Sequence, residues 1–182
     1  SSLPESPTAR PPWRQMSEDS DPATREPADL ECTHGLRRRQ ERVPTILQME
    51  ATECGAASLA MILASQGRWV PLEELRVECG VSRNGATAKS VVVAARRYGM
   101  QAGGFSIDLH HLPDEQFPLI AHWDFDHFLV IEGTSSKGVQ VNDPARGRCL
   151  VPWEEADRSL TGLILRVTPG PEFETGGPPP SL

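Results

Sequence analysis

The feature that most constrains this chain is an apolar run that opens with a cysteine and a glycine, Cys54 and Gly55. Four residues of the run have the i, i+3, i+4, i+7 spacing of one helix face: Ala56, Leu59, Ala60 and Leu63. The spacing predicts a helix that begins near Cys54. A thiol at a helix N-terminus lies at the positive end of the helix dipole, which favours the nucleophilic thiolate. Packing is the alternative role, because free cysteine is among the most buried residue types.

Proline is concentrated at the two ends of the chain. Of the 17 prolines among 182 residues, eleven lie in residues 1–42 and 169–182, and both stretches hold few aromatic residues. Such stretches bury too little apolar area to offset the entropy lost on ordering. The composition therefore predicts a disordered or linker extension at 1–42, one folded domain at 43–168, and a Pro/Gly-rich tail at 169–182.

Charge and hydropathy exclude some classes of partner. The formal net charge of -7 argues against nucleic acid. The basic cluster at 37–42 is local and is expected to be a solvated linker, with contact to an anionic surface as the alternative. The sequence contains no run of 18 apolar residues, the length that could span a membrane, and no apolar signal segment opens the chain. We therefore expect a cytoplasmic protein with reduced cysteines.

Helical patterns come first along the chain and strand patterns follow. Helices are predicted from Cys54 to near Gly67, over 71–78, from the residue after Thr87 to a stop at Gly99, and over 153–160. Strands are predicted over 117–123, 128–132, 139–142, 148–151 and 163–167, with a hairpin turn at 135–138. Helices followed by an antiparallel sheet indicate the α+β class, in which a helix can present a nucleophile to a strand that carries its base.

A histidine and a carboxylate downstream could complete a catalytic group with Cys54. His127 lies in an apolar run, and Asp143 lies in an Asn-Asp-Pro sequence. Histidine exchanges protons near neutral pH, and a carboxylate can fix its tautomer and orientation. Gln48 enters the predicted helix and could donate its amide to the oxyanion of a tetrahedral intermediate.

Structural roles for these residues remain open. Asp143 could only cap a turn, and Asp124 and Asp126 are rival carboxylates for His127. The other downstream histidines, His110, His111 and His122, are expected at the surface or in structural roles. Cys32 and His34 could bind zinc together with Cys79 and Cys149, but the spacings fit no usual zinc pattern, so we predict no metal site.

Three ordered motifs resemble the bacteriocin-processing cysteine peptidases found at the N-terminus of peptidase-containing ABC transporters. They are residues 48–61 with Glu-Cys-Gly-Ala-Ala at their centre, the His-Phe-Leu-Val sequence at 127–130, and the Asn-Asp-Pro sequence within 141–147. The resemblance covers about residues 40–175. Four further stretches resemble the subgroup tied to nitrile-hydratase-like leader peptides: 45–50, 71–76, 79–83 and 169–173.

The resemblance implies a papain-like fold and cleavage of leader peptides after a Gly-Gly or Gly-Ala pair. It makes Cys54 the nucleophile, His127 the base, Asp143 the orienting carboxylate and Gln48 part of the oxyanion hole. The hydrolysis would need no cofactor. ATP would be used only by a transporter part, and no GxxxxGK[ST] motif occurs in this chain.

The implied partners are a leader peptide and the transmembrane and ATP-binding domains of an ABC transporter. The implied location is then the cytoplasmic face of the plasma membrane. Trp123 and Phe125, which flank the histidine motif, are candidate walls of the slot that admits the two small residues, with core packing as the alternative for each.

Three other functional hypotheses remain. One is a catalytically inactive domain of the same fold that only binds the export substrate. Another is a papain-fold acyltransferase that transfers the acyl group to an amine. The third is autoinhibition by residues 1–42 if they reach the cleft.

Overall fold

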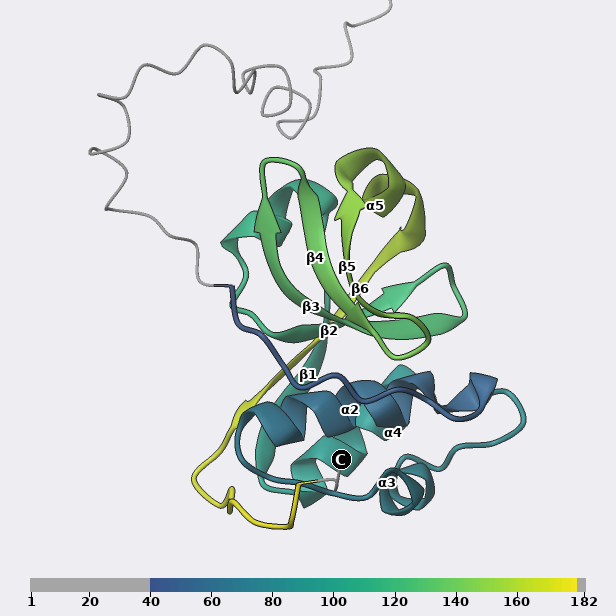
Figure 1. Ribbon diagram of the computed structural model, residues 1–182, viewed down its shortest axis with the longest axis vertical. Helices are drawn as coiled ribbons and strands as arrows, with labels where there is room; N and C mark the ends of the chain where they lie inside the picture. The colour runs from purple at the N-terminus through teal and green to yellow at the C-terminus, as the bar shows by residue number, and fades with distance from the viewer. Residues whose placement is uncertain (1–39, 180–182) are drawn as a thin grey trace, which may run out of the picture.

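The computed structural model of this chain describes residues 40–179, in which helices precede an antiparallel sheet (Figure 1). The helical elements are η3 (Ala51–Glu53), α2 (Cys54–Ser65), α3 (Leu72–Glu78), α4 (Ala88–Arg97), η4 (Leu109–Asp114) and α5 (Trp153–Ser159). The strands are β1 (Met100–Ser106), β2 (Leu119–Trp123), β3 (His127–Ser135), β4 (Gly138–Asp143), β5 (Gly147–Pro152) and β6 (Leu160–Pro169). Helices α2, α3 and α4 gather in one half of the molecule and most of the sheet forms the other, which confirms the predicted α+β class.

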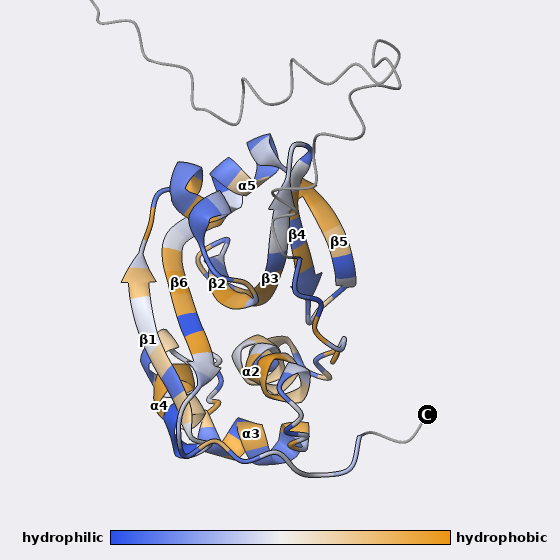
Figure 2. Ribbon diagram, turned by 90° about the vertical axis from the view of Figure 1, so that its left-hand side faces the viewer, coloured by the Kyte–Doolittle hydropathy of each residue, from blue (hydrophilic) through white to orange (hydrophobic). Residues whose placement is uncertain are grey.

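Helix α2 is buried along almost its whole length. Every residue from Cys54 to Ala64 is buried, and the helix packs against β3 on one side and against α3 and α4 on the other. Figure 2 shows α2 enclosed between the sheet and the other helices. A helix that is apolar all round is stable only in such a position. The Cys-Gly pair therefore begins a central helix of the domain.

The ends of α4 follow from local sequence. Thr87 accepts a hydrogen bond from the Ser90 N–H at 3.1 Å, and the Ser90 hydroxyl bonds the Thr87 N–H at 3.0 Å. This reciprocal cap satisfies backbone donors that a helix N-terminus leaves free. At the other end Gly99 adopts φ +82°, a conformation that favours glycine. Both predicted ends of this helix are confirmed.

The six strands are ordered β1-β6-β2-β3-β4-β5, and all neighbours are antiparallel. Residues alternate between the two faces, as strand geometry requires. Along β3, Phe128 and Val130 join the core shared with α2, α3 and α4. Leu129 and Ile131 join a second core covered by α5 and η4. The sheet thus buries both faces, and its helix-facing side positions the site described below.

Strand β1 is an element that the sequence patterns did not predict. It contains Gly103 and Gly104, which weaken a strand signal because glycine has no side chain to pack. Five of its seven residues are polar, exposed or glycine, so the local pattern does not favour a strand. The strand forms because it pairs along its full length with β6. Tertiary pairing, rather than local propensity, therefore produces β1.

The structure continues the folded region beyond the predicted boundary at 168. That boundary falls inside β6, and the described part of the tail, residues 170–179, returns across the helices. Gly176 accepts a hydrogen bond from the Trp69 N–H at 2.7 Å and donates its own N–H to Gly67 at 3.0 Å. Phe173 packs against the helix-side core. Backbone pairing and one aromatic anchor order this Pro/Gly-rich segment.

Most of the predicted N-terminal extension, with Cys32, His34 and most of the basic cluster, lies outside the described residues. At its inner end Glu41 donates its N–H to the Glu132 carbonyl at 2.9 Å, and Val43 is buried. Within residues 40–179 no helix combines the length and the apolar character needed to cross a membrane.

Candidate active site

Cys54 is the first residue of α2, where the sequence predicted it. It is 4 % exposed. A Cβ atom placed on the next residue, Gly55, would lie 3.1 Å from Val91 and 3.2 Å from Ala86. These separations are closer than side chains normally approach, so glycine lets α2 pack tightly beside α4. The thiol is thus held on a helix that has little room to shift.

The sheet brings His127 and Asp143 together. His127 is the first residue of β3 and Asp143 the last of β4, and these two strands are paired neighbours. The Nε2 atom of His127 lies 2.7 Å from Oδ1 of Asp143. The Cys54 side chain also acts on the imidazole, because it helps to raise the pKa of His127. Both expected partners of His127 therefore influence it, and Asp143 does so through a direct hydrogen bond.

The surroundings of His127 favour its protonated form. Burial alone would lower its pKa, but hydrogen bonds with Asp143 and Cys54 and the charges of both partners raise the pKa to about 9. Near neutral pH the imidazole consequently carries a proton. A protonated imidazole can donate its proton to a leaving amine as a general acid.

Asp143 is almost completely buried and is surrounded by donors. Burial would raise its pKa, but His127, the Ala145 N–H and Arg146 lower it. The Ala145 N–H donates to Oδ1 at 2.8 Å, and Nε of Arg146 lies 3.3 Å from Oδ2. The turn that follows Asp143 therefore holds the carboxylate in one orientation. The carboxylate stays charged and available to His127.

Gln48 lies beside the same turn. Its backbone N–H donates to the Pro144 carbonyl at 2.8 Å, which ties the segment before α2 to the residue after Asp143. Its side-chain Oε1 is buried and has no hydrogen-bond partner within residues 40–179. Buried amide atoms normally have partners, so Oε1 is available to accept a hydrogen bond from a group that enters the site.

The structure separates the two aromatic candidates. Trp123 is 2 % exposed and belongs to the core on the far side of the sheet, which is the packing alternative. Phe125 is 79 % exposed in the turn between β2 and β3, next to His127 in sequence. Asp124 and Phe125 adopt φ values of +50° and +64°. Only Phe125 is therefore open to a substrate in this structure.

The rival carboxylates and histidines do not join the group. Asp124 and Asp126 are exposed and make no side-chain hydrogen bond to His127. His122 instead lies 3.0 Å from the Thr161 hydroxyl, and burial lowers its pKa.

The described cysteines other than Cys54 are free thiols with raised pKa values. Cys79 is fully buried, and burial together with the charge of Glu78 raises its pKa to about 12. Cys149 is half-buried, and its pKa is raised mainly by burial. Thiols with raised pKa values are weak nucleophiles near neutral pH, so neither resembles a reactive cysteine.

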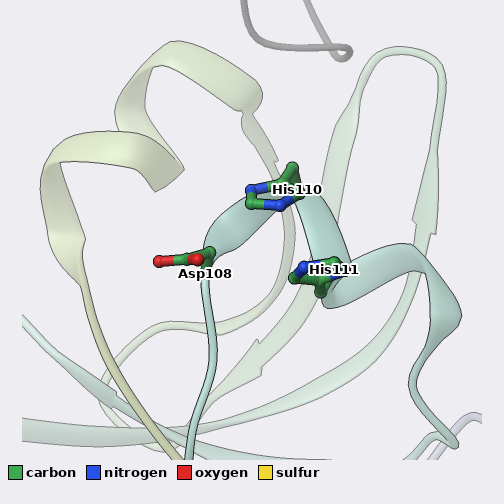
Figure 3. A group of neighbouring side chains, drawn as sticks. All are labelled: Asp108, His110 and His111. Carbon is green, nitrogen blue, oxygen red and sulfur yellow. The ribbon is translucent and has the colours of Figure 1, made fainter.

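A group that could hold a cation lies away from these residues. Asp108, His110 and His111 are exposed at the start of η4, and their ligand atoms lie within 4.8 Å of one another (Figure 3). Sequence spacing did not single out this trio, because a turn brings Asp108 to the histidine pair. Imidazole and carboxylate are ligands for divalent transition metals.

Comparison with known proteins points to one family. The sequence profile of the Peptidase C39 family matches residues 42–172. The colicin V secretion/processing ATP-binding protein CvaB of Escherichia coli is 40 % identical over 138 residues, which are 76 % of this chain and 20 % of that protein. The transport/processing ATP-binding protein ComA of Streptococcus pneumoniae is 30 % identical over 135 residues, 70 % of this chain and 19 % of ComA. This chain thus spans about a fifth of the length of these relatives.

Solved structures agree with the sequence comparisons. A double glycine motif protease from an AMS/PCAT transporter, crystallised in complex with the leader peptide, is 51 % identical with a TM-score of 0.71, covering 74 % of this chain and 96 % of that one. The peptidase domain of Streptococcus ComA has a TM-score of 0.67 at 23 % identity, covering 70 % of this chain and 99 % of that one, and supports the fold alone. The architecture is accordingly the papain-like fold that the sequence predicted.

Proposed function

Because this chain belongs to the peptidase C39 family, we propose that it is a cysteine peptidase that cuts leader peptides from ribosomally made precursors. The cut would follow a Gly-Gly or Gly-Ala pair, and an ABC transporter would export the released core. The observation that carries the proposal is the 2.7 Å contact of His127 with Asp143, in a chain 51 % identical to a double glycine motif protease.

In the proposed reaction the Cys54 thiolate attacks the carbonyl carbon of the second small residue. His127 gives its proton to the leaving amine, and the core peptide departs. Water then attacks the thioester while His127 accepts a proton, which releases the leader and restores the thiolate. Asp143 keeps the imidazole oriented, and the Gln48 side chain with the Cys54 N–H would bind the oxyanion. These steps use the protein's own groups and water, and the proposal includes no cofactor.

An apolar groove beside Gln48 is our candidate surface for the helical part of the leader. Its volume is about 360 Å³, and its lining residues are Ile46, Leu47, Met49, Trp69, Val70, Pro71, Leu72 and Pro178. Leu47 and Met49, which flank Gln48, are 54 % and 85 % exposed. Exposed apolar side chains grouped in one place mark binding surfaces. A leader helix bound there would lead its small-residue pair toward the nucleophile.

The groove makes a separate kinetic prediction. Met49→Asp should raise KM on the order of 10-fold and leave kcat within about 2-fold, because it removes binding that is equal in the ground and transition states. Val77→Asp is the matched control, since Val77 is an exposed apolar residue outside this groove. Equal KM values for the two variants would place leader binding elsewhere.

Mass spectrometry of a synthetic precursor tests the proposed function. A leader ending in Gly-Gly or Gly-Ala, fused to a short core, is incubated with the wild type, with Cys54→Ala and with Cys149→Ala as a thiol control. We expect cleavage after the small pair, lost in Cys54→Ala alone. Leader binding without cleavage would support a binding domain instead, and an amine adduct would support an acyltransferase.

The wider setting is also a proposal. The flanking stretches at 45–50 and 71–76 favour nitrile-hydratase-like leaders. In CvaB and ComA the matching region is about a fifth of the protein, and these two are named as secretion/processing and transport/processing proteins. We infer that this domain works at the cytoplasmic face of the plasma membrane beside transmembrane and ATP-binding domains of such a transporter.

A further inference from the structure

The residue before Cys54 carries a buried carboxylate that the proposed reaction does not use. Glu53 ends η3, and it is 2 % exposed. A buried carboxylate is costly unless charged or hydrogen-bonding groups surround it. Its position next to the nucleophile therefore requires a structural or functional reason.

The contacts of Glu53 all fix the segment that enters the nucleophile helix. Oε2 accepts hydrogen bonds from the N–H groups of Met49 at 2.7 Å and Glu50 at 2.9 Å. Oε1 lies 3.1 Å from Nε of Arg76, which α3 supplies. Two consecutive backbone N–H groups thus point at one carboxylate oxygen.

Gln48 is held from the other side. Its own N–H donates to the Pro144 carbonyl at 2.8 Å, beside Asp143. Gln48 therefore lies between two anchors, one next to Asp143 and one formed by Glu53 next to Cys54. An oxyanion-hole donor must lie within about 2.7–3.1 Å of the developing charge, so small shifts of this segment matter.

We propose that Glu53 is the positioning residue of the oxyanion hole. It fixes Gln48 relative to Cys54 by binding the two N–H groups that follow Gln48. Arg76 has a second role, because its positive charge offsets that of Glu53 beside a site where negative charge develops. The inference rests on the proposed peptidase function and adds residues that act through Gln48 rather than on the substrate.

A double-mutant cycle in leader cleavage tests this inference. Gln48→Ala should lower kcat on the order of 10²-fold, and Glu53→Ala should lower it roughly 10-fold to 100-fold with KM nearly unchanged. The two changes combined should be little worse than Gln48→Ala alone, because both remove the same donor. Independent, multiplying losses would overturn the role through Gln48.

Two further variants separate positioning from general stability. Glu53→Gln keeps an oxygen for the Met49 and Glu50 N–H groups but places an NH₂ group against Arg76, so kcat should fall less than in Glu53→Ala. Glu73→Ala, which removes an exposed carboxylate of α3, should leave kcat unchanged. Equal losses for the alanine and glutamine variants at Glu53, or none, would contradict the proposal.

A measurement that needs no substrate turnover tests the positioning role of Glu53 separately from the proposed peptidase function. Amide hydrogen exchange of Met49 and Glu50 should quicken at least about 10-fold in Glu53→Ala while the amides of α2 keep their protection. Unchanged exchange would overturn the positioning role even in an active enzyme. An inactive wild type with the expected exchange would instead count against the peptidase function alone.

Discussion

Cys54 and Asp143 are held in their places by different forces. Cys54 belongs to a helix whose neighbours are almost all apolar, and close packing of Gly55 on α4 sets its position. Asp143 ends a strand, and hydrogen bonds from His127, Ala145 and Arg146 set its orientation. Packing is strong but without direction, whereas hydrogen bonds are directional. Packing of α2 therefore fixes the position of the Cys54 thiol, and the hydrogen bonds of Asp143 fix the orientation of the His127 imidazole and its protons.

A further group of polar contacts lies next to Asp143 in the sheet and centres on Glu132. Glu132 of β3 is fully buried and binds Arg148 through contacts of 2.8 and 3.0 Å. It also accepts the Val43 N–H at 2.9 Å, and Asn142 donates to the Val43 carbonyl at 3.2 Å. Burial would raise the pKa of Glu132, but these donors lower it. The residue before Asp143, Asn142, is therefore fixed by a buried charged network.

The largest effect should come from the strand side. Asp143→Asn should lower kcat on the order of 10²–10⁴-fold, because it removes the charge that orients His127 and stabilises the imidazolium. In the wild type, activity should fall as the pH rises through about 9, where His127 loses its proton. In the variant this fall in activity should occur at a lower pH. Cleavage rates between pH 6 and 10 provide the check, and an unchanged pH dependence would contradict the assignment.

The next effect concerns stability and pH. The pKa of His127 is raised above its unfolded value near 6.5, so its stabilising contribution is complete below that pH and is lost as the pH rises through about 9. The difference in unfolding free energy between wild type and His127→Gln should shrink by on the order of 2–3 kcal/mol between pH 6 and 10. Urea denaturation at several pH values measures it. A difference that stays constant would mean that Asp143 does not hold a charged imidazole.

A smaller effect is expected on the helix side. Gly55→Val should cost about 1–3 kcal/mol of stability, because its side chain would press on Val91 and Ala86. Gly104→Val is the control, since a Cβ there meets Leu165 at an ordinary 3.6 Å. Thermal unfolding of the two variants gives the comparison. Equal stabilities would show that α2 can move aside, and packing would then not fix Cys54.

The smallest effect should follow Arg146→Ala. The Arg146 side chain is 66 % exposed, and its contact with Asp143 is 3.3 Å long. Exposed ion pairs contribute at most about 1 kcal/mol, so kcat should change by less than about 3-fold. A drop in kcat above 10-fold, restored by Arg146→Lys, would show that the hydrogen bonds that orient Asp143 depend on this exposed arginine.

Local patterns predicted much of the fold. The helix that begins at Cys54, the helix start after Thr87 and the turn before Gly138 each depend on neighbouring residues, and the structure confirms them. The pairing of His127 with Asp143 was also expected, and the two side chains are in contact. Their catalytic roles stay predictions until cleavage is measured.

The parts that sequence reasoning missed depend on contacts between distant residues. Strand β1 exists through its pairing with β6, and the segment after Pro169 is ordered by the backbone of Gly67 and Trp69. The Glu53–Arg76 and Glu132–Arg148 pairs join residues that no spacing rule connects. Sequence reasoning left Trp123 between the substrate slot and the core, and the alternation along β2 places it in the core.

The position of β6 has a consequence for synthesis on the ribosome. This last strand lies between β1 and β2, so β1 cannot join the other four strands of the sheet until residues 160–169 have emerged. Before then β1 lacks its partner and β2 exposes an open edge. Cys54, His127 and Asp143 are all translated earlier than the strand that completes their sheet. The nascent domain therefore completes its six-strand sheet only in a late step.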